Sequence, residues 1–396
     1  MAWLLHVAVV MSDQPVAKAP SISFAKASRD SPKGEDAACT LLPGAGAPAA
    51  FAIFDGHSGK QFAIKCSELI CQRLMEVGPP FKSETIKDMM WAVDEEIGAQ
   101  GVVDGATAQI LLIEQAGDTF KGTLAWCGDS SAVVCDTSAA SGTVLYATDS
   151  HTAGPDHQGG GGWTGEKMRL EFYRAVRDKL ENNDTKPHDS LSDVTTREMV
   201  EEALGRVDKE VIKSLGKEVD EEEIEMLVKA FRRSTVIAKT FPFGKEVRKK
   251  MYVRQRSPTH DVNQVWVVAT AEDRADPSYS DLQMTRSMGD WKASDLVLPE
   301  PQIHTFEVPA DGIYRLVLAS DGLWDVCSFE AACVHMKKAS TVESCAKALL
   351  KIAEREYLDV RGHDMMDDDT TVLVIELNPA GVNYSAPQGA GCCTLQ

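Results

Sequence analysis

Residues 316–325 read LVLASDGLWD, and this stretch is the most informative in the chain. Its apolar first half predicts a buried strand, and the step Asp321-Gly322 predicts a sharp turn, because glycine adopts backbone angles that other residues avoid. A carboxylate at such a corner is held at a strand end with its oxygens available. The pattern recurs where residues 51–54 lead into Asp55-Gly56-His57 and where residues 124–127 lead into Gly128-Asp129.

A single Asp-Gly step is most often an ordinary turn. Three such corners after apolar runs, with the acidic run at residues 367–369 before a last apolar run, are harder to explain as turns alone. Carboxylate and carbonyl oxygens in this number suit hard divalent cations. The sequence therefore predicts a site for Mg²⁺ or Mn²⁺ at the ends of buried strands.

The composition narrows the class of protein. The chain has 396 residues, 43% of them hydrophobic, and a net charge of −19. This length buries a full core. An acidic balance argues against nucleic-acid partners and against a polybasic membrane surface. The apolar residues 1–11 lack a basic flank, so we expect no signal peptide, and no window reaches the ~20 apolar residues of a membrane helix. Ten cysteines without a C-x-x-C pair predict neither a zinc site nor a disulfide framework, and they fit a reducing compartment, the cytoplasm or nucleus.

Short apolar runs and helical stripes mix without strict alternation, which favours an α+β sandwich over a doubly wound sheet. We expect a central β-sandwich of two mixed or antiparallel sheets, flanked by α-helices. The expected strands are Ala49–Phe54, Ile110–Glu114, Thr123–Cys127, Ala132–Cys135, Ile313–Ala319 and Thr371–Leu377. The expected helices follow Gly59 and Ser83 and span Thr341–Glu354.

The middle of the chain differs in pattern. Residues 155–262 contain four consecutive glycines and then three amphipathic stripes, which begin at Met168, Val200 and Ile224. A capping box from Thr195 to Glu198 opens the second stripe. We expect a helical insertion within a domain of residues 21–378, between an N-terminal segment (1–20) and a flexible tail (379–396). A basic segment ends the insertion, with Lys245, Arg248, Lys249, Lys250, Arg254 and Arg256.

Seven motifs resemble one known family. They are Glu35-Asp36-Ala37, Phe51–Gly59, Gly105–Ala108, Cys127–Ala132, Thr285–Asp290, Ala319–Asp325 and Asp368–Thr371. By the order and the residues of these motifs, the chain is similar to the metal-dependent protein serine/threonine phosphatases of type 2C. The resemblance spans residues 35–377, nearly the whole chain.

The resemblance implies a β-sandwich with metals at one end and hydrolysis of phosphoserine and phosphothreonine in proteins. It implies that Asp55 bridges two Mg²⁺ or Mn²⁺ ions and that Gly56 offers its carbonyl. By the same resemblance, Asp321 and Asp368 complete the coordination of one metal, while Glu35 and Asp36 hold waters around the two ions. Asp129 and Asp325 match the site of a weaker third metal, and His57 matches the acid that protonates the leaving oxygen.

Three departures from the family pattern stand out. The position four residues before Glu35-Asp36, where the family has a phosphate-binding arginine, is Ser31, so Arg29 or Lys33 is expected to replace it. Ser131 replaces a second arginine, and the segment from His151 to Arg286 is longer than usual. None of these removes an expected metal ligand.

Two other classes remain open. A pseudophosphatase would keep the fold as a binding scaffold, but Asp55, Asp321 and Asp368 are all present. A different two-metal hydrolase, such as a nuclease, would favour a distributed basic surface that this chain lacks. We expect an active, monomeric phosphatase whose partners are phosphoprotein substrates.

The last four residues, Cys393-Thr394-Leu395-Gln396, fit a C-a-a-X prenylation pattern. Cys392 is a candidate for a second lipid, and the Ala-, Gly- and Pro-rich residues 378–391 predict an accessible tail. No polybasic stretch precedes the pattern. The alternatives are peripheral membrane attachment through a lipid at Cys393 and a plain soluble tail.

Overall fold

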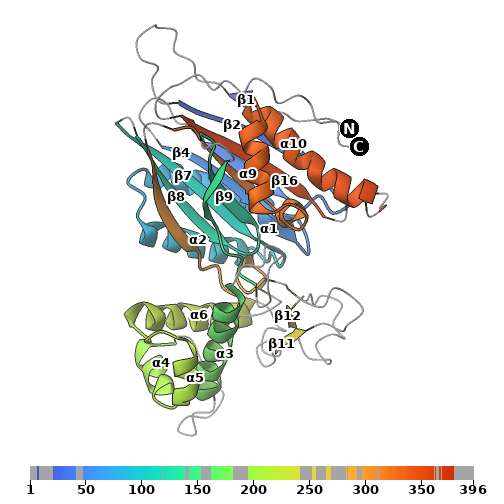
Figure 1. Cartoon of the computed structure of the whole chain (residues 1–396). Helices are drawn as coiled ribbons and strands as arrows, with labels where there is room; N and C mark the ends of the chain where they lie inside the picture. The colour runs from blue at the N-terminus through green and yellow to red at the C-terminus, as the bar shows by residue number, and fades with distance from the viewer. Residues whose placement is uncertain are drawn as a thin grey trace. The chain divides into compact units, whose positions relative to one another are not determined.

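The chain divides into two compact units, which are described separately (Figure 1). Unit 1 comprises residues 1–90, 106–149 and 301–396, and unit 2 comprises residues 91–105 and 150–300. The computed structural model describes residues 7–8, 21–41, 48–117, 119–138, 142–152, 162–181, 195–240, 252–255, 265–268, 282, 284–291, 297–309, 312–360, 362, 365–366 and 368–378.

Unit 1 contains two sheets whose neighbouring strands pair antiparallel. The six-stranded sheet has the order β1 (Val7–Ala8), β2 (Ser21–Arg29), β16 (Thr370–Asn378), β15 (Tyr314–Ala319), β9 (Ser131–Asp136), β10 (Thr143–Ala147). The five-stranded sheet has the order β14 (Gln302–Val308), β8 (Thr119–Cys127), β7 (Ala108–Ala116), β4 (Ala49–Phe54), β3 (Ala37–Leu41).

The core of unit 1 lies between these sheets. One buried cluster joins Phe51 and Leu111 of the five-stranded sheet to Leu316 and Leu318 of the other. Val317, the residue between these leucines, belongs instead to a second cluster under helices, because side chains alternate between the two faces of a strand. The expected two-sheet sandwich flanked by helices is confirmed.

Helices cover the outer faces of the sandwich. α8 (Asp321–Trp324), α9 (Phe329–Lys338) and α10 (Val342–Glu354) bury apolar residues against the six-stranded sheet, and a π-helical turn (Arg355–Val360) follows α10. α1 (Gln61–Val77) packs on β3 and β4. α2 (Ser83–Gly98) follows it and continues into unit 2.

Unit 2 is built around α3 (Gly162–Glu181), α4 (Arg197–Leu204), α5 (Lys209–Ser214) and α6 (Glu221–Thr240). Their apolar stripes meet in one core that includes Phe172, Val200 and Leu227. β11 (Tyr252–Gln255) and β12 (Val265–Val268) form an antiparallel pair. Three further strands of the described residues, not all of them in unit 2, have two residues each: β5 (Gly56–His57), β6 (Gly105–Ala106) and β13 (Met288–Gly289).

Two details of the expected insertion are wrong. The second stripe forms two helices. α4 ends at Leu204 with Gly205 as its C-cap, and Asp208 caps α5 by accepting the N–H of Glu210 at 2.9 Å. The N-cap of α4 is Thr196, whose hydroxyl accepts the N–H of Met199 at 3.4 Å, not Thr195. The basic segment's side chains and the C-terminal Cys392 and Cys393 lie outside the described residues.

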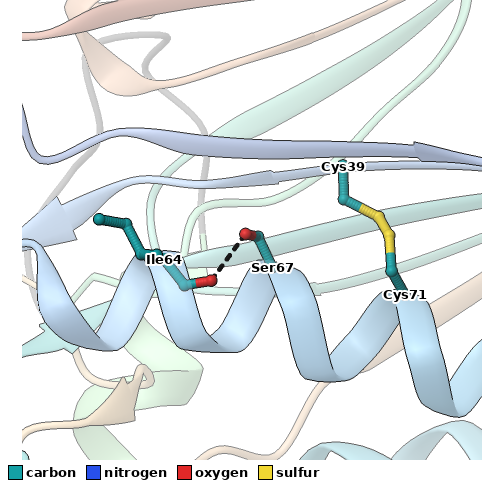
Figure 2. Close-up of a disulfide and its surroundings, with 4 residues drawn as sticks. All are labelled: Cys39, Ile64, Ser67 and Cys71. Atoms are coloured by element: carbon teal, nitrogen blue, oxygen red, sulfur yellow. Dashed lines mark hydrogen bonds between the residues drawn. A yellow bond between two sulfur atoms is a disulfide. The ribbon is translucent and has the colours of Figure 1, made fainter.

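The cysteine spacing did not predict a disulfide, but the structure contains one. Cys39 of β3 and Cys71 of α1 form a disulfide (Figure 2). The other cysteines in the described ranges, at positions 66, 127, 135, 327, 333 and 345, are buried and are not joined in disulfides. Among the described helices none is long and apolar enough to cross a membrane.

Candidate metal centre

Strand register brings the predicted carboxylates to one end of each sheet. In the six-stranded sheet Ala319, the last residue of β15, pairs with Ser131 at the start of β9 and with Val372 near the start of β16. In the five-stranded sheet Ala37, at the start of β3, pairs with Phe54, the last residue of β4. The segments that carry the predicted ligands therefore leave or enter the sheets at these shared ends.

The carboxylates are close enough to shift one another's protonation. Burial raises the pKa of Asp55 well above its usual range, and the neighbouring charges of Asp36, Asp321, Asp368 and Asp129 raise it further. Unpaired like charges in a buried place favour the protonated form. A divalent cation relieves the same repulsion, so this arrangement is suited to one.

The pKa values of two more of these carboxyls are also raised. Burial and the charges of Asp325, Asp129 and Asp368 raise the pKa of Asp321 well above its usual range. Burial raises the pKa of Asp36 to about 6. All six predicted aspartates thus belong to one electrostatic cluster within unit 1.

Asp55 is held by hydroxyls from two other motifs. Its backbone N–H donates to Thr107 Oγ1 at 3.3 Å, and Ser130 Oγ donates to its Oδ2 at 3.4 Å. Thr107 and Ser130 are joined by a hydrogen bond of 2.7 Å. Sequence reasoning gave these two residues no role, although both lie inside the quoted motifs. They orient Asp55 and leave most of its acceptor capacity for a ligand.

Asp36 offers the clearest test of whether a cation fits. Ser320 Oγ donates to Asp36 Oδ2 at 3.1 Å and accepts the N–H of Thr371 at 2.9 Å. Asp36 Oδ1 is buried, and no donor among the described residues forms a hydrogen bond with it. A buried carboxylate oxygen without a donor is costly unless a cation or water serves it. The residues present fit a hard divalent ion.

The candidate metal site does not enclose an ion with protein ligands alone. Among the described residues no group of three His, Cys, Asp or Glu side chains is spaced as a ready-made metal site. Mg²⁺ keeps several of its waters and binds through one or two carboxylates, so it does not require a closed protein cage. The expected roles of Glu35 and Asp36 in holding waters agree with such a site.

Glu35, Gly56 and Gly59 meet closely. The N–H of Gly59 donates to Glu35 Oε1 at 2.7 Å. A Cβ at Gly56 would lie 2.5 Å from the carbonyl oxygen of Glu35, so a side chain there would displace this segment. Burial raises the pKa of Glu35. The N–H of Gly59 opposes that rise, and so do the charges of Lys33 and, more weakly, of the half-buried His57, which therefore lies near Glu35.

The two candidate phosphate-binding cations lie in different surroundings. Lys33 Nζ donates to Asp368 Oδ1 at 3.0 Å, so Lys33 lies at the carboxylate cluster. Arg29 Nη1 instead lies 3.5 Å from Glu354 Oε1, on the helix α10 side. Of the two, the structure brings Lys33 to the candidate centre.

Part of the chain matches a known protein family by sequence. Residues 253–357 match the family model described as protein phosphatase 2C. "Probable protein phosphatase 2C 5" of Arabidopsis thaliana is 32% identical over 106 residues, 27% of this chain and 23% of that protein. "Probable protein phosphatase 2C 7" of Oryza sativa subsp. japonica is 39% identical over 72 residues, 18% of this chain and 19% of that protein. The matches thus span about a fifth to a quarter of these curated relatives.

The fold comparison covers much more of the chain. The crystal structure of a serine-threonine phosphatase 2C from Toxoplasma gondii superposes with a TM-score of 0.56 at 15% identity, over 91% of this chain and 98% of that one. A phosphatase from a pathogenic strain of Toxoplasma gondii gives a TM-score of 0.51 at 14% identity, over 93% and 96%. These likenesses show a shared fold.

Proposed function

We propose that this chain, a member of the protein phosphatase 2C family, hydrolyses phosphoserine and phosphothreonine in proteins with the help of divalent cations. One observation carries the proposal. The carboxyls of Asp36, Asp55, Asp321 and Asp368 converge, and the salt bridge from Lys33 to Asp368 compensates one of these four charges. Such a surplus of negative charge is the arrangement that divalent metal chemistry needs.

Each residue has a role in this proposal. Asp55, with the carbonyl of Gly56, would hold two ions, and Asp321 and Asp368 would complete one of them. Glu35 and Asp36 would orient waters, and Asp129 and Asp325 would serve a third, weaker ion. Bound Mg²⁺ or Mn²⁺ supplies Lewis-acid chemistry, activating water and neutralising charge on the phosphoryl oxygens.

The remaining steps belong to two side chains of the same unit. Lys33 would bind a phosphoryl oxygen as a point charge, in place of the bidentate arginine of the family. His57 would donate a proton to the leaving serine or threonine oxygen, a task that imidazole performs near neutral pH. Ser130 and Thr107 would keep Asp55 in the required orientation.

The test is phosphate release by the purified full chain from a phosphothreonine peptide, with Mn²⁺, with Mg²⁺ and with chelator. We expect release that requires either ion, stops with chelator and is much slower with a phosphotyrosine peptide. The matched control is Asp321→Ala prepared in the same way. Release no faster than that of the Asp321→Ala protein at every Mn²⁺ concentration would instead identify a pseudophosphatase.

A further inference from the structure

Asp369 receives an unusual set of hydrogen bonds. Its Oδ1 accepts the backbone N–H of Ser31 at 2.5 Å and of Gly34 at 3.3 Å, and its Oδ2 accepts the N–H of Glu35 at 2.5 Å. The residue is 2% exposed. Three backbone donors from one short loop therefore point at a single buried carboxylate, about 335 residues away in the chain. Charge-assisted bonds of this kind are stronger than neutral ones.

The backbone of Asp369 is itself fixed to the end of the six-stranded sheet. Its N–H donates to Asp368 Oδ1 at 3.0 Å, and its carbonyl oxygen, 3.3 Å from Ser320 Oγ, shares that hydroxyl's hydrogen with Asp36. A Cβ on Gly322 would lie 2.3 Å from that carbonyl oxygen, so glycine is needed for this close approach. The loop is thus attached to a rigid point beside two of the predicted ligands.

The loop at residues 31–35 carries groups that the proposed reaction uses. Lys33 reaches Asp368, and Glu35 accepts the N–H of Gly59. Gly34 has a φ of +61°, and Ser31 Oγ accepts the N–H of Lys33 at 3.1 Å, so the loop turns tightly between these two side chains. Its position depends on what holds its backbone, because none of residues 31–35 belongs to a strand: β2 ends at Arg29 and β3 begins at Ala37.

We propose that Asp369 is a positioning residue: it holds residues 31–35 so that Lys33 and Glu35 face the metal centre. The inference rests on the proposed function for its consequence in catalysis. Asp369 is not itself assigned to a cation, because both of its oxygens face the positive ends of N–H dipoles. Removing a group that orients metal-facing residues commonly weakens metal affinity about 10- to 100-fold.

The test compares Asp369→Asn with wild type in the full chain. We expect faster amide hydrogen exchange at Ser31, Gly34 and Glu35, and a Kd for Mn²⁺ about 10-fold weaker by calorimetry. KM for the phosphopeptide should rise more than kcat falls. The matched control is Asp136→Asn, which also removes a carboxylate that accepts a backbone N–H, that of Ser138 at 2.8 Å, but at the other end of β9. It should leave exchange in the loop and Mn²⁺ affinity unchanged.

The inference requires both the exchange and the Mn²⁺ changes, and either one without the other overturns it. Lower thermal stability alone would assign Asp369 a merely structural role and overturn it too. If Asp369→Asn does not fold, wild type decides: amides of residues 31, 34 and 35 as protected as those of β16 support the inference, and exchange as fast as an exposed loop overturns it. Hydrogen exchange and Mn²⁺ affinity do not depend on turnover, so a wild type without phosphatase activity would refute the proposed function separately.

Discussion

Glu166 of helix α3 binds Arg286 through both of its carboxylate oxygens. Arg286 Nη2 lies 2.6 Å from Oε1, and Nε donates to Oε1 at 3.1 Å and to Oε2 at 3.2 Å. Arg169 and the hydroxyl of Thr285 also donate to this carboxylate. Burial alone would raise the pKa of Glu166, but the two guanidinium groups hold it well below its usual range. Helix α3 is therefore tied by a largely buried ionic cluster to the Thr285–Asp290 motif.

This cluster predicts a large stability loss in Glu166→Gln. Removing Glu166 leaves two partly buried cations uncompensated, and the cost approaches the roughly 3–5 kcal/mol of fully buried sites. The matched control is Asp178→Asn on the same helix, whose exposed pair with Arg174 spans 4.0 Å and should contribute less than about 1 kcal/mol. Denaturant unfolding followed by tryptophan fluorescence measures both. Equal losses in the two variants would contradict the prediction.

The carboxylate cluster predicts that Asp55→Asn and Asp321→Ala each lose most of the activity. Each removes a proposed primary ligand, and a loss of several kcal/mol in transition-state stabilisation corresponds to at least about 100-fold in kcat/KM. Asp359→Asn, a change at an exposed aspartate of the same unit, should behave as wild type. The measurement is Mn²⁺-dependent phosphate release. Undiminished activity in either ligand variant would remove the assignment.

The raised carboxyl pKa values predict how stability depends on pH without metal. A carboxyl whose pKa is raised on folding binds its proton more tightly in the folded state, so stability falls as pH rises from the unfolded value of ~3.9 through the folded value. That folded value is about 6 for Asp36 and higher than usual for Asp55 and Asp321. We expect the Tm in chelator to be higher at pH 5.5 than at pH 7.5, by an amount that Asp321→Asn reduces. Saturating Mn²⁺ should raise the Tm most at pH 7.5. A metal-free Tm that climbs over this range would refute the prediction.

The contact of Lys33 with Asp368 predicts different effects for the two candidate phosphate-binding cations. Lys33→Ala should raise KM for a phosphopeptide about 10-fold, the loss of one charge-assisted contact of roughly 1.4 kcal/mol. Arg29→Ala removes a contact with Glu354 and should change KM less than twofold. Steady-state kinetics at fixed Mn²⁺ compares them. If KM rose more for Arg29→Ala than for Lys33→Ala, Arg29 rather than Lys33 would be the phosphate-binding residue.

The sequence allowed the prediction of those features that depend on neighbours along the chain. Buried strands such as Ala49–Phe54 are continuous apolar runs, and the aspartates that follow them were found from the same local pattern. Strands β2 (Ser21–Arg29) and β14 (Gln302–Val308) were missed, because they mix polar and apolar residues and β14 lies at a sheet edge. Edge strands bury less, so their patterns are weak.

Features that join distant segments could not be predicted. Asp369 binds backbone N–H groups, which leave no trace in residue identity, and its partners lie more than 330 residues away. The choice of Lys33 over Arg29 depends on where each side chain points, since the two are only four positions apart. The break between α4 and α5 could have been inferred from Gly205 and Asp208, a common stop and start pair.

The disulfide between Cys39 and Cys71 predicts a reductant-sensitive stability. It joins β3, which begins directly after Asp36, to α1, which begins shortly after Gly59, and closes a loop with a sequence separation of 32. Closing a loop of this length in the unfolded chain is expected to stabilise the fold by about 3–4 kcal/mol. Cys71→Ser should therefore unfold at lower denaturant than wild type when no reductant is present.

Reductant provides the control for that comparison. Dithiothreitol should lower the stability of wild type to that of Cys71→Ser and leave the variant unchanged, because only wild type has a bond to lose. Intact mass after alkylation should show two fewer modified thiols in non-reduced wild type than in reduced wild type. If wild type and Cys71→Ser unfolded at the same denaturant concentration without reductant, while the mass showed the bridge intact, the bridge would make no net contribution to stability.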